Sequence, residues 1–169
     1  LTLSGNATAD YDTDITNITI ECGAVELVAS ATSFSASTGV TFTALAESLA
    51  YSGGTLADGQ TFEEAAANDG SIDNSSPVII TLTNDTLTGV DTDNFYAAGK
   101  ILVSNTPAGL TPVLTRTSDT TISVTFTGNA TSHASANSIN NLTIEFLDTA
   151  FVRSPANAIT NYRVTNRIV

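Results

Sequence analysis

The chain contains two copies of one segment, and this internal repeat constrains its architecture more than any other feature. Residues 124–146 (VTFTGNATSHASANSINNLTIEF) and residues 1–22 (LTLSGNATADYDTDITNITIEC) are identical at ten of twenty-two aligned positions, with one single-residue gap. Self-similarity at a long fixed spacing is typical of arrays that repeat one structural unit. We therefore expect the chain to be derived from tandem repeats.

The pattern of apolar and polar residues predicts an all-β protein. Apolar residues alternate with Thr, Ser and Asn at the period of two that marks half-buried strands. The expected strands are 1–4, 15–20, 24–30, 40–46, 78–83, 95–104, 112–117, 121–127, 141–147 and 162–169. Turn-forming segments such as 105–109 (NTPAG) separate them at the spacing of an antiparallel sandwich. Helix is expected only as single turns, at 62–67 (FEEAAA) and, as an alternative to strand, at 44–51.

Glycine-rich sequence between residues 52 and 59 predicts a break between two units. Residues 1–51 are expected to be an N-terminal partial repeat, made of the late strands of a module plus a linker. Residues 61–169 are expected to be one complete β-sandwich module. A partial repeat followed by a complete module indicates one of two things. The chain is either a fragment of a longer array or a subunit whose terminal strands complete a neighbour's sheet.

The second option is strand donation, in which an extended segment pairs with the open edge of another copy. The expected assembly strands are Leu1–Ser4 and Tyr162–Val169. Such contacts do not close on themselves, so they would join identical chains head to tail into a filament. Arg153, Arg163 and Arg167 near one end and Asp10, Asp12 and Asp14 near the other favour that orientation, or merely offset local charge.

The acidic balance of the chain limits its partners. It has 17 Asp and Glu but only 5 Lys and Arg, a formal net charge of −12, which repels nucleic acid and anionic lipid. No apolar run reaches the roughly 18 residues that a membrane-spanning helix needs. Cys22 is the single cysteine, so it forms no internal disulfide and is expected to be buried. A secreted or cell-surface protein fits this composition.

Four segments in chain order carry a resemblance to a known family. They are FEEAAANDGSI, VIITLTNDTLTG, GKILVSNTPAGLTPVLTRTSDTTISVTFTGNAT and INNLTIEFLDTAF. Together they resemble an immunoglobulin-like tandem module of large bacterial surface and secreted proteins. Residues 61–169 match the whole module and residues 1–22 its later half, whereas residues 23–60 depart from the pattern. The resemblance implies an immunoglobulin-like β-sandwich with a spacer, adhesive or filament-forming role, and no catalytic activity.

Acidic and amide side chains in two loops suggest a divalent cation site. Ca²⁺ binds six to eight oxygen atoms, usually gathered where loops meet. The candidate ligands are Glu64, Asn68, Asp69, Asp91 and Asp93, with Glu63 and Asp73 beside them. Loops of this kind would face a junction between tandem sandwiches. The alternative is that these acidic loops are simply solvated, and no complete EF-hand loop is present.

Glycosylation sequons begin at six asparagines. They are Asn6, Asn17, Asn74, Asn84, Asn129 and Asn141. These motifs accept glycans in a suitable secretory pathway, but they also arise by composition in Thr-rich and Asn-rich sequence. The predicted strands at Asn17 and Asn141 make a glycan there harder to accommodate.

His133 and Lys100 are the only histidine and the only lysine. A single histidine supports neither a zinc site nor a catalytic triad, so His133 is expected to be a loop residue. Lys100 lies in a predicted strand, where a Lys–Asn crosslink would need a buried carboxylate catalyst.

The sequence favours a non-enzymatic extracellular structural unit that associates with copies of itself or with neighbouring repeats. The alternative is a carbohydrate-binding or ligand-binding accessory module, with a surface glycan as partner. Trp is absent and Phe and Tyr are few, which disfavours an aromatic sugar platform. A hydrolase would need paired carboxylates or an activated nucleophile, and the scattered acids support neither.

Overall fold

The computed structural model describes residues 45–169, and residues 46–169 form one compact unit. The strands predicted at 1–4, 15–20 and 24–30 lie outside the described residues, as does nearly all of 40–46. Cys22 and the candidate assembly strand Leu1–Ser4 also lie outside them.

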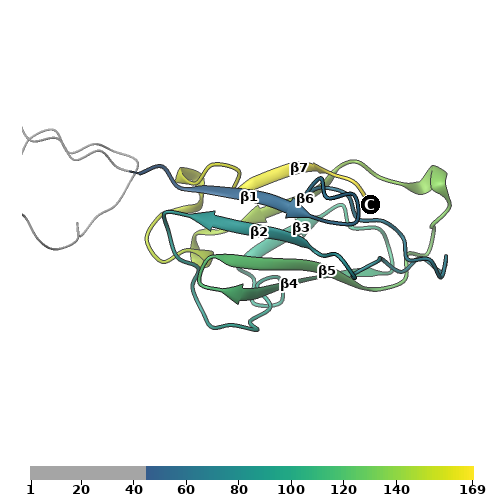
Figure 1. Cartoon of the computed structure of the whole chain (residues 1–169), viewed down its shortest axis with the longest axis horizontal. Helices are drawn as coiled ribbons and strands as arrows, with labels where there is room; N and C mark the ends of the chain where they lie inside the picture. The colour runs from purple at the N-terminus through teal and green to yellow at the C-terminus, as the bar shows by residue number, and fades with distance from the viewer. Residues whose placement is uncertain (1–44) are drawn as a thin grey trace, which may run out of the picture. The chain divides into compact units, whose positions relative to one another are not determined.

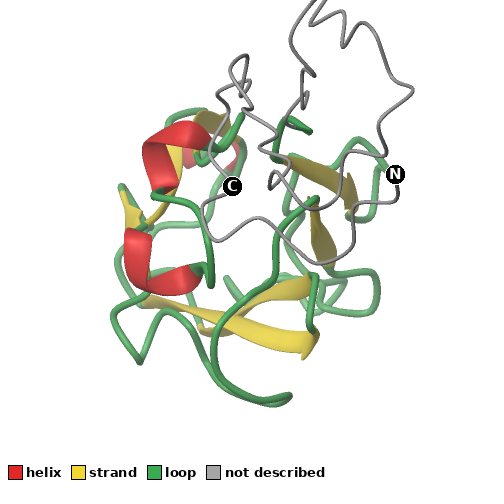
Figure 2. Ribbon diagram, turned by 90° about the vertical axis from the view of Figure 1, so that its left-hand side faces the viewer, coloured by secondary structure: helices red, strands yellow, loops and turns green. Residues whose placement is uncertain are grey.

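Two antiparallel sheets make up the described fold (Figure 1). The four-stranded sheet has the order β1 (Ser48–Gly53), β2 (Val78–Thr83), β5 (Thr121–Gly128), β4 (Leu110–Ser118). The three-stranded sheet has the order β3 (Ile101–Ser104), β6 (Leu142–Phe146), β7 (Arg163–Arg167). Three single 3₁₀ turns, η1 (Ser135–Asn137), η2 (Asp148–Ala150) and η3 (Ala156–Ala158), lie in the connections (Figure 2). The prediction of an all-β antiparallel fold is confirmed.

Strand alternation explains the core. Each strand turns every second side chain inward, and the inward residues of β2, β5 and β6 are large and apolar. The fully buried ones include Val78, Ile80, Ile122, Val124, Leu142, Ile144 and Phe146. Burying one such side chain contributes roughly 1.5–3 kcal/mol, so these three strands hold the two sheets together.

β1 and β7 join the two sheets along one edge and run in the same direction. Parallel bridges connect Ser48 with Thr160 and Thr61 with Ile168. We call the end where β1 starts the proximal end; it carries the connections 84–100, 119–120 and 147–162. The end where β7 finishes is the distal end; it carries the connections 54–77, 105–109 and 129–141 (Figure 1).

The compact unit starts earlier than the expected domain start at residue 61. β1 spans the predicted boundary at residue 51 and pairs with β2 from Ser48–Thr83 to Gly53–Val78. Its sequence, SLAYSG, is made largely of small residues and ends in glycine, so its alternation is weak. β1 nevertheless forms because β2 offers it a complete backbone ladder.

The helical turn predicted at 62–67 is wrong. Glu64 instead forms an antiparallel bridge with Ile72, and the Ala65 N–H donates to the Ser71 carbonyl at 2.8 Å. Pairing with residues six to eight positions further along the chain thus overrides local helix propensity. β3 is also shorter than predicted, because residues 95–99 form turns before Ile101.

The C-terminal strand completes its own sandwich. β7 pairs with β6 on one side, and on the other the Ile168 N–H donates to the Gln60 carbonyl at 3.1 Å. Val169 exchanges two backbone hydrogen bonds with Ile139. Among the described strands β7 pairs only with β6 and stays at the edge of its sheet, and on the other side only Ile168, just beyond β7, is hydrogen-bonded. The assembly role expected for Tyr162–Val169 stays a prediction.

Candidate functional site

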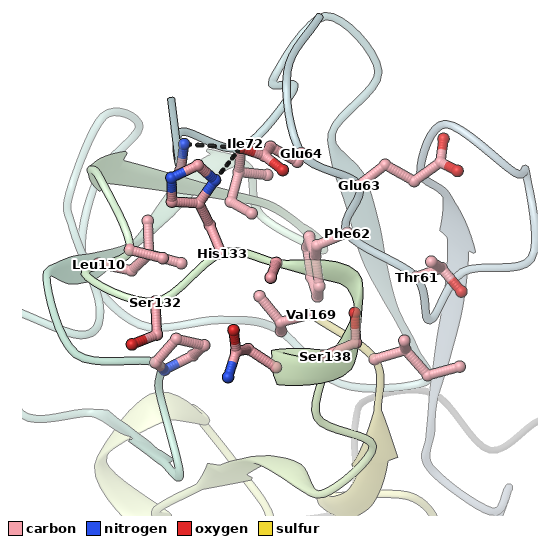
Figure 3. A pocket seen from close by; sticks show the side chains of 16 residues that line it. Thr61, Phe62, Glu63, Glu64, Ile72, Leu110, Ser132, His133, Ser138 and Val169 are labelled. Atoms are coloured by element: carbon pink, nitrogen blue, oxygen red, sulfur yellow. Dashed lines mark hydrogen bonds and ion pairs between the residues drawn. The ribbon is translucent and has the colours of Figure 1, made fainter. Parts of the chain in front are cut away.

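A pocket of about 440 Å³ opens at the distal end (Figure 3). Its walls come from four segments far apart in the sequence: the connection after β1, the loop before β4, the β5–β6 loop and the last two residues. Because the β5–β6 loop belongs to the repeated segment 124–146, part of this pocket is built from repeated sequence.

The floor of the pocket is apolar. Phe62, Ile72 and Leu110 line it and are at most 9% exposed. Phe62 also packs edge to face on Phe126, with ring centroids 5.0 Å apart and an interplanar angle of 79°. The floor is therefore an extension of the core to the surface, held rigid by aromatic packing.

The rim carries one acid–base contact. Glu64 Oε1 accepts the Gly70 N–H at 2.7 Å and lies 2.9 Å from His133 Nδ1 (Figure 3). His133 is a loop residue, as expected, but no sequence pattern predicted its contact with a carboxylate 69 positions away. Glu64 thereby fixes the β5–β6 loop to the connection after β1.

The segment GNAT at residues 128–131, present in both sequence copies, clamps this end together. Gly128 has φ +83°, and an added Cβ would lie 2.2 Å from the Gly109 carbonyl oxygen. Asn129 Nδ2 donates to the Asp69 carbonyl at 2.9 Å, and the Ala130 N–H donates to the Gly70 carbonyl at 2.8 Å. The Thr131 N–H donates to the Ala108 carbonyl at 2.8 Å. Three of the four repeated residues thus donate a hydrogen bond to a neighbouring loop, and Gly128 allows the close approach of Gly109.

The five predicted metal ligands fall into two groups at opposite ends. Glu64, Asn68 and Asp69 lie at the distal end, where β4 starts; Asp91 and Asp93 lie at the proximal end, where Arg116 near the end of β4 meets Asp91. At about 3.3 Å per residue, the stretch of β4 between these ends spans roughly 20 Å. The described residues contain no group of three His, Cys, Asp or Glu placed to hold a metal ion.

The carboxylates in both groups are engaged by protein donors. Asp69 accepts the Ser71 hydroxyl at 2.6 Å, and this bond is the main reason that the pKa of Asp69 is lowered. Ser75 holds Asp73 in the same way, with its N–H at 2.9 Å, and lowers the pKa of that carboxyl. Asp91 pairs with the buried Arg116, and Asp93 accepts the Val90 N–H at 3.0 Å.

Three sequon asparagines use their amides within the fold. Asn74 Nδ2 donates to the Phe126 carbonyl at 2.8 Å while Asn74 Oδ1 accepts the Phe126 N–H at 3.1 Å. Asn84 Nδ2 donates to the Ala46 carbonyl at 2.8 Å, and Asn129 is part of the clamp. A glycan on any of these nitrogens would replace one of the two hydrogens of an amide that already donates a hydrogen bond within the fold.

Lys100, the only lysine, makes a cation–π contact with Phe95. Its Nζ lies 4.5 Å from the centroid of the Phe95 ring.

No helix among residues 45–169 is long and apolar enough to cross a membrane.

Comparison with known proteins gives little beyond this description. No family model matches the chain, and no curated protein sequence matches it. Among solved structures, the chain is similar to part of the chitinase ChiW from Paenibacillus sp. str. FPU-7, described as a bacterial cell-surface-expressed multi-modular enzyme. The TM-score is 0.42 and the identity 20%, over 74% of this chain and 12% of the chitinase chain. We draw no functional argument from a similarity at this level.

Proposed function

We propose that the chain is a non-catalytic structural segment of an extracellular or cell-surface protein, built from immunoglobulin-like modules that follow one another in tandem. The observation that carries the proposal is the internal repeat. Its second copy, residues 124–146, covers most of β5, the distal β5–β6 loop and all of β6. Because β5 and β6 lie in different sheets, a repeat of this segment supplies one strand to each sheet of a sandwich.

The strand order supports the immunoglobulin-like assignment. Sheets ordered β1-β2-β5-β4 and β3-β6-β7 correspond to the ABED and CFG sheets of constant-type immunoglobulin domains. The described chain forms all seven strands of that arrangement, so the sandwich needs no strand from a neighbour.

The direction of β1 and β7 supports tandem linkage. The chain enters the sandwich at the proximal end and leaves it at the distal end, since both strands run the same way. Modules joined in this manner extend in a line, as a spacer or stalk requires. One chain supplies the seven described strands, so we favour tandem linkage over filament formation by strand exchange.

A rearranged chain tests the proposal. Placing residues 46–123 in front of Leu1 supplies β1 to β4 and the start of β5, the parts that precede the repeated segment. We expect a second cooperative unfolding transition and protection of the added residues from protease. The matched control carries the same residues after Val169, where no copy of the repeated segment follows them; there the addition is expected to be digested. Equal digestion in both chains would overturn the tandem proposal.

Solution mass and negative-stain electron microscopy of the 169-residue chain separate linkage from self-assembly. We expect monomers with added Ca²⁺ and after chelation. Filaments would favour strand exchange, and their loss on chelation would locate a cation at the contact.

The distal pocket favours a second candidate, a ligand-binding accessory module. Its apolar floor and polar rim are the usual makeup of small-ligand sites. Titration with oligosaccharides, followed by the nuclear magnetic resonance signal of His133, tests this candidate. A saturable shift would favour it over a purely structural role.

A further inference from the structure

We propose that the distal pocket receives the proximal end of the module that follows in the array. The partner is thus a second copy of this sandwich. The proposal rests on the tandem function proposed above and adds a specific interface to it.

The sequence match extends beyond the repeated segment. Cys22 aligns with Phe146, an offset of 124 residues, and the same offset pairs residues 23–45 with 147–169 without a gap. Four positions are then identical: Val28 with Val152, Ser30 with Ser154, Val40 with Val164 and Thr41 with Thr165. Ser154 is buried and donates its hydroxyl to Glu47 at 3.2 Å, and residues 164 and 165 belong to β7. In the register of the repeat, residues 23–45 thus share four of 23 positions with residues 147–169.

This register leaves no free linker between modules. Leu45 is the counterpart of Val169, and Ala46 follows it directly. Val169 is fixed to its own module by hydrogen bonds of 2.9 and 3.1 Å with Ile139. The Ala46 carbonyl is fixed to its own module by Asn84, and adjacent Cα atoms are 3.8 Å apart. A copy of residues 46–169 placed directly after Val169 would therefore follow it without a linker.

The pocket lies where that contact falls. Val169 is one of its lining residues, so a module joined directly after Val169 would start at the pocket wall (Figure 3). In a second copy joined after Val169, the first residue is Ala46. Its carbonyl accepts a hydrogen bond from Asn84, so the loop of Asn84 would lie next to Val169. The proximal end of the next module is thereby placed over the pocket.

The two ends are complementary in apolar surface. Two valines at the proximal end are unusually exposed, Val90 at 67% and Val152 at 58%. Their loops are held side by side, because the Val152 N–H donates to the Thr86 carbonyl at 2.9 Å. The pocket offers the floor of Phe62, Ile72 and Leu110. Covering the exposed valines at this pocket removes their apolar surface from water.

His133, the only histidine, is a built-in reporter of the pocket. The test compares the 169-residue chain with the same chain extended after Val169 by a second copy of residues 46–169. The second copy carries His133→Gln, so that one histidine remains. Diethyl pyrocarbonate should modify His133 several-fold more slowly in the extended chain. Val90→Asp with Val152→Asp in the second copy should restore the original rate.

Leu56→Asp in the second copy is the matched control, since Leu56 is 58% exposed, like Val152, but lies in the distal connection 54–77, at the opposite end from the two valines. It should leave His133 protected. An unchanged modification rate beside a second copy that unfolds cooperatively would overturn the pocket interface and leave the tandem function standing. A second copy that stays unfolded would overturn the tandem function and this interface with it.

Discussion

The guanidinium of Arg167 lies over the ring of Tyr51, with Arg167 Cζ 4.3 Å from the ring centroid. Arg167 is in β7 and Tyr51 in β1, so this cation–π contact joins the two sheets along the edge where both strands run in the same direction. Burial raises the pKa of Tyr51, and the nearby Arg167 opposes that rise. Burial also lowers the pKa of Arg167. At this edge the neutral phenol of Tyr51 therefore packs against the charged guanidinium of Arg167.

Tyr51→Phe should make the protein more resistant to alkali. The pKa of Tyr51 is raised in the folded state above the value of about 10 in the unfolded chain. The resulting stability is present below pH 10 and is lost as pH rises beyond it, because only the unfolded chain ionises readily. At pH 7 the variant should lose at most about 1 kcal/mol, since it keeps the ring and gives up one 3.3 Å hydrogen bond to the Asn161 carbonyl.

Urea unfolding between pH 7 and pH 11 checks this prediction. The difference between wild type and variant should shrink or reverse above pH 10. Tyr162→Phe serves as the control, and a parallel fall of wild type and Tyr51→Phe would contradict the assignment.

The variant Asp91→Asn tests whether Asp91 belongs to an ion pair or to an empty metal site. The two alternatives predict opposite signs for the change in unfolding free energy. Asp91 contacts the buried Arg116, so in calcium-free buffer the variant should lose about 1 kcal/mol of unfolding free energy. Removing one carboxylate from an unoccupied cation site would instead relieve repulsion and stabilise the protein. Thermal unfolding in chelator provides the measurement, with the exposed Glu63→Gln as the control for net charge.

The alternating apolar segments were predictable because their pattern is local. The predicted strands at 78–83 and 121–127 coincide almost residue for residue with β2 and β5. β1 was missed because its small residues give little alternation, and the helical turn at 62–67 was wrong because Glu64 pairs with Ile72 across a loop.

The contacts of the candidate site could not be predicted from the sequence. The contacts of Glu64 with His133 and of Asp91 with Arg116 depend on which loops share an end of the sandwich, and no local pattern contains that information.

Gly128→Ala should destabilise the module on the order of 2–4 kcal/mol. Gly128 has φ +83°, and its new Cβ would lie 2.2 Å from the Gly109 carbonyl oxygen, which is backbone and has little room to move. Gly99→Ala is a matched control, because Gly99 has φ +67° with nothing within 4 Å of an added Cβ. The control should cost only about 1 kcal/mol, the backbone strain alone. Equal losses in urea unfolding would show that the close approach to Gly109 is not what requires glycine.

Asp58→Asn should remove part of the protein's sensitivity to acid. Asp58 accepts the Thr61 hydroxyl at 2.6 Å and the N–H groups of Gln60 and Thr61, both at 2.9 Å. The Thr61 hydroxyl is the largest cause of the lowered pKa of Asp58. The folded value thus lies below the unfolded value of about 3.9. The stability from this group is present above that pH and is lost as pH falls through the folded pKa.

At pH 7 the variant should be less stable by about 0.5–1 kcal/mol, because an amide keeps one acceptor oxygen and replaces the other with a donor. Below pH 3 the two proteins should converge, since protonation of Asp58 gives the wild type a similar loss. Thermal unfolding from pH 2 to pH 7 measures this convergence. Thr61→Val is a useful companion, because it removes the hydroxyl that contributes most to the shift and should reproduce part of the flattened acid profile. A constant gap across the whole range would mean that Asp58 affects the fold through its shape and not through its charge.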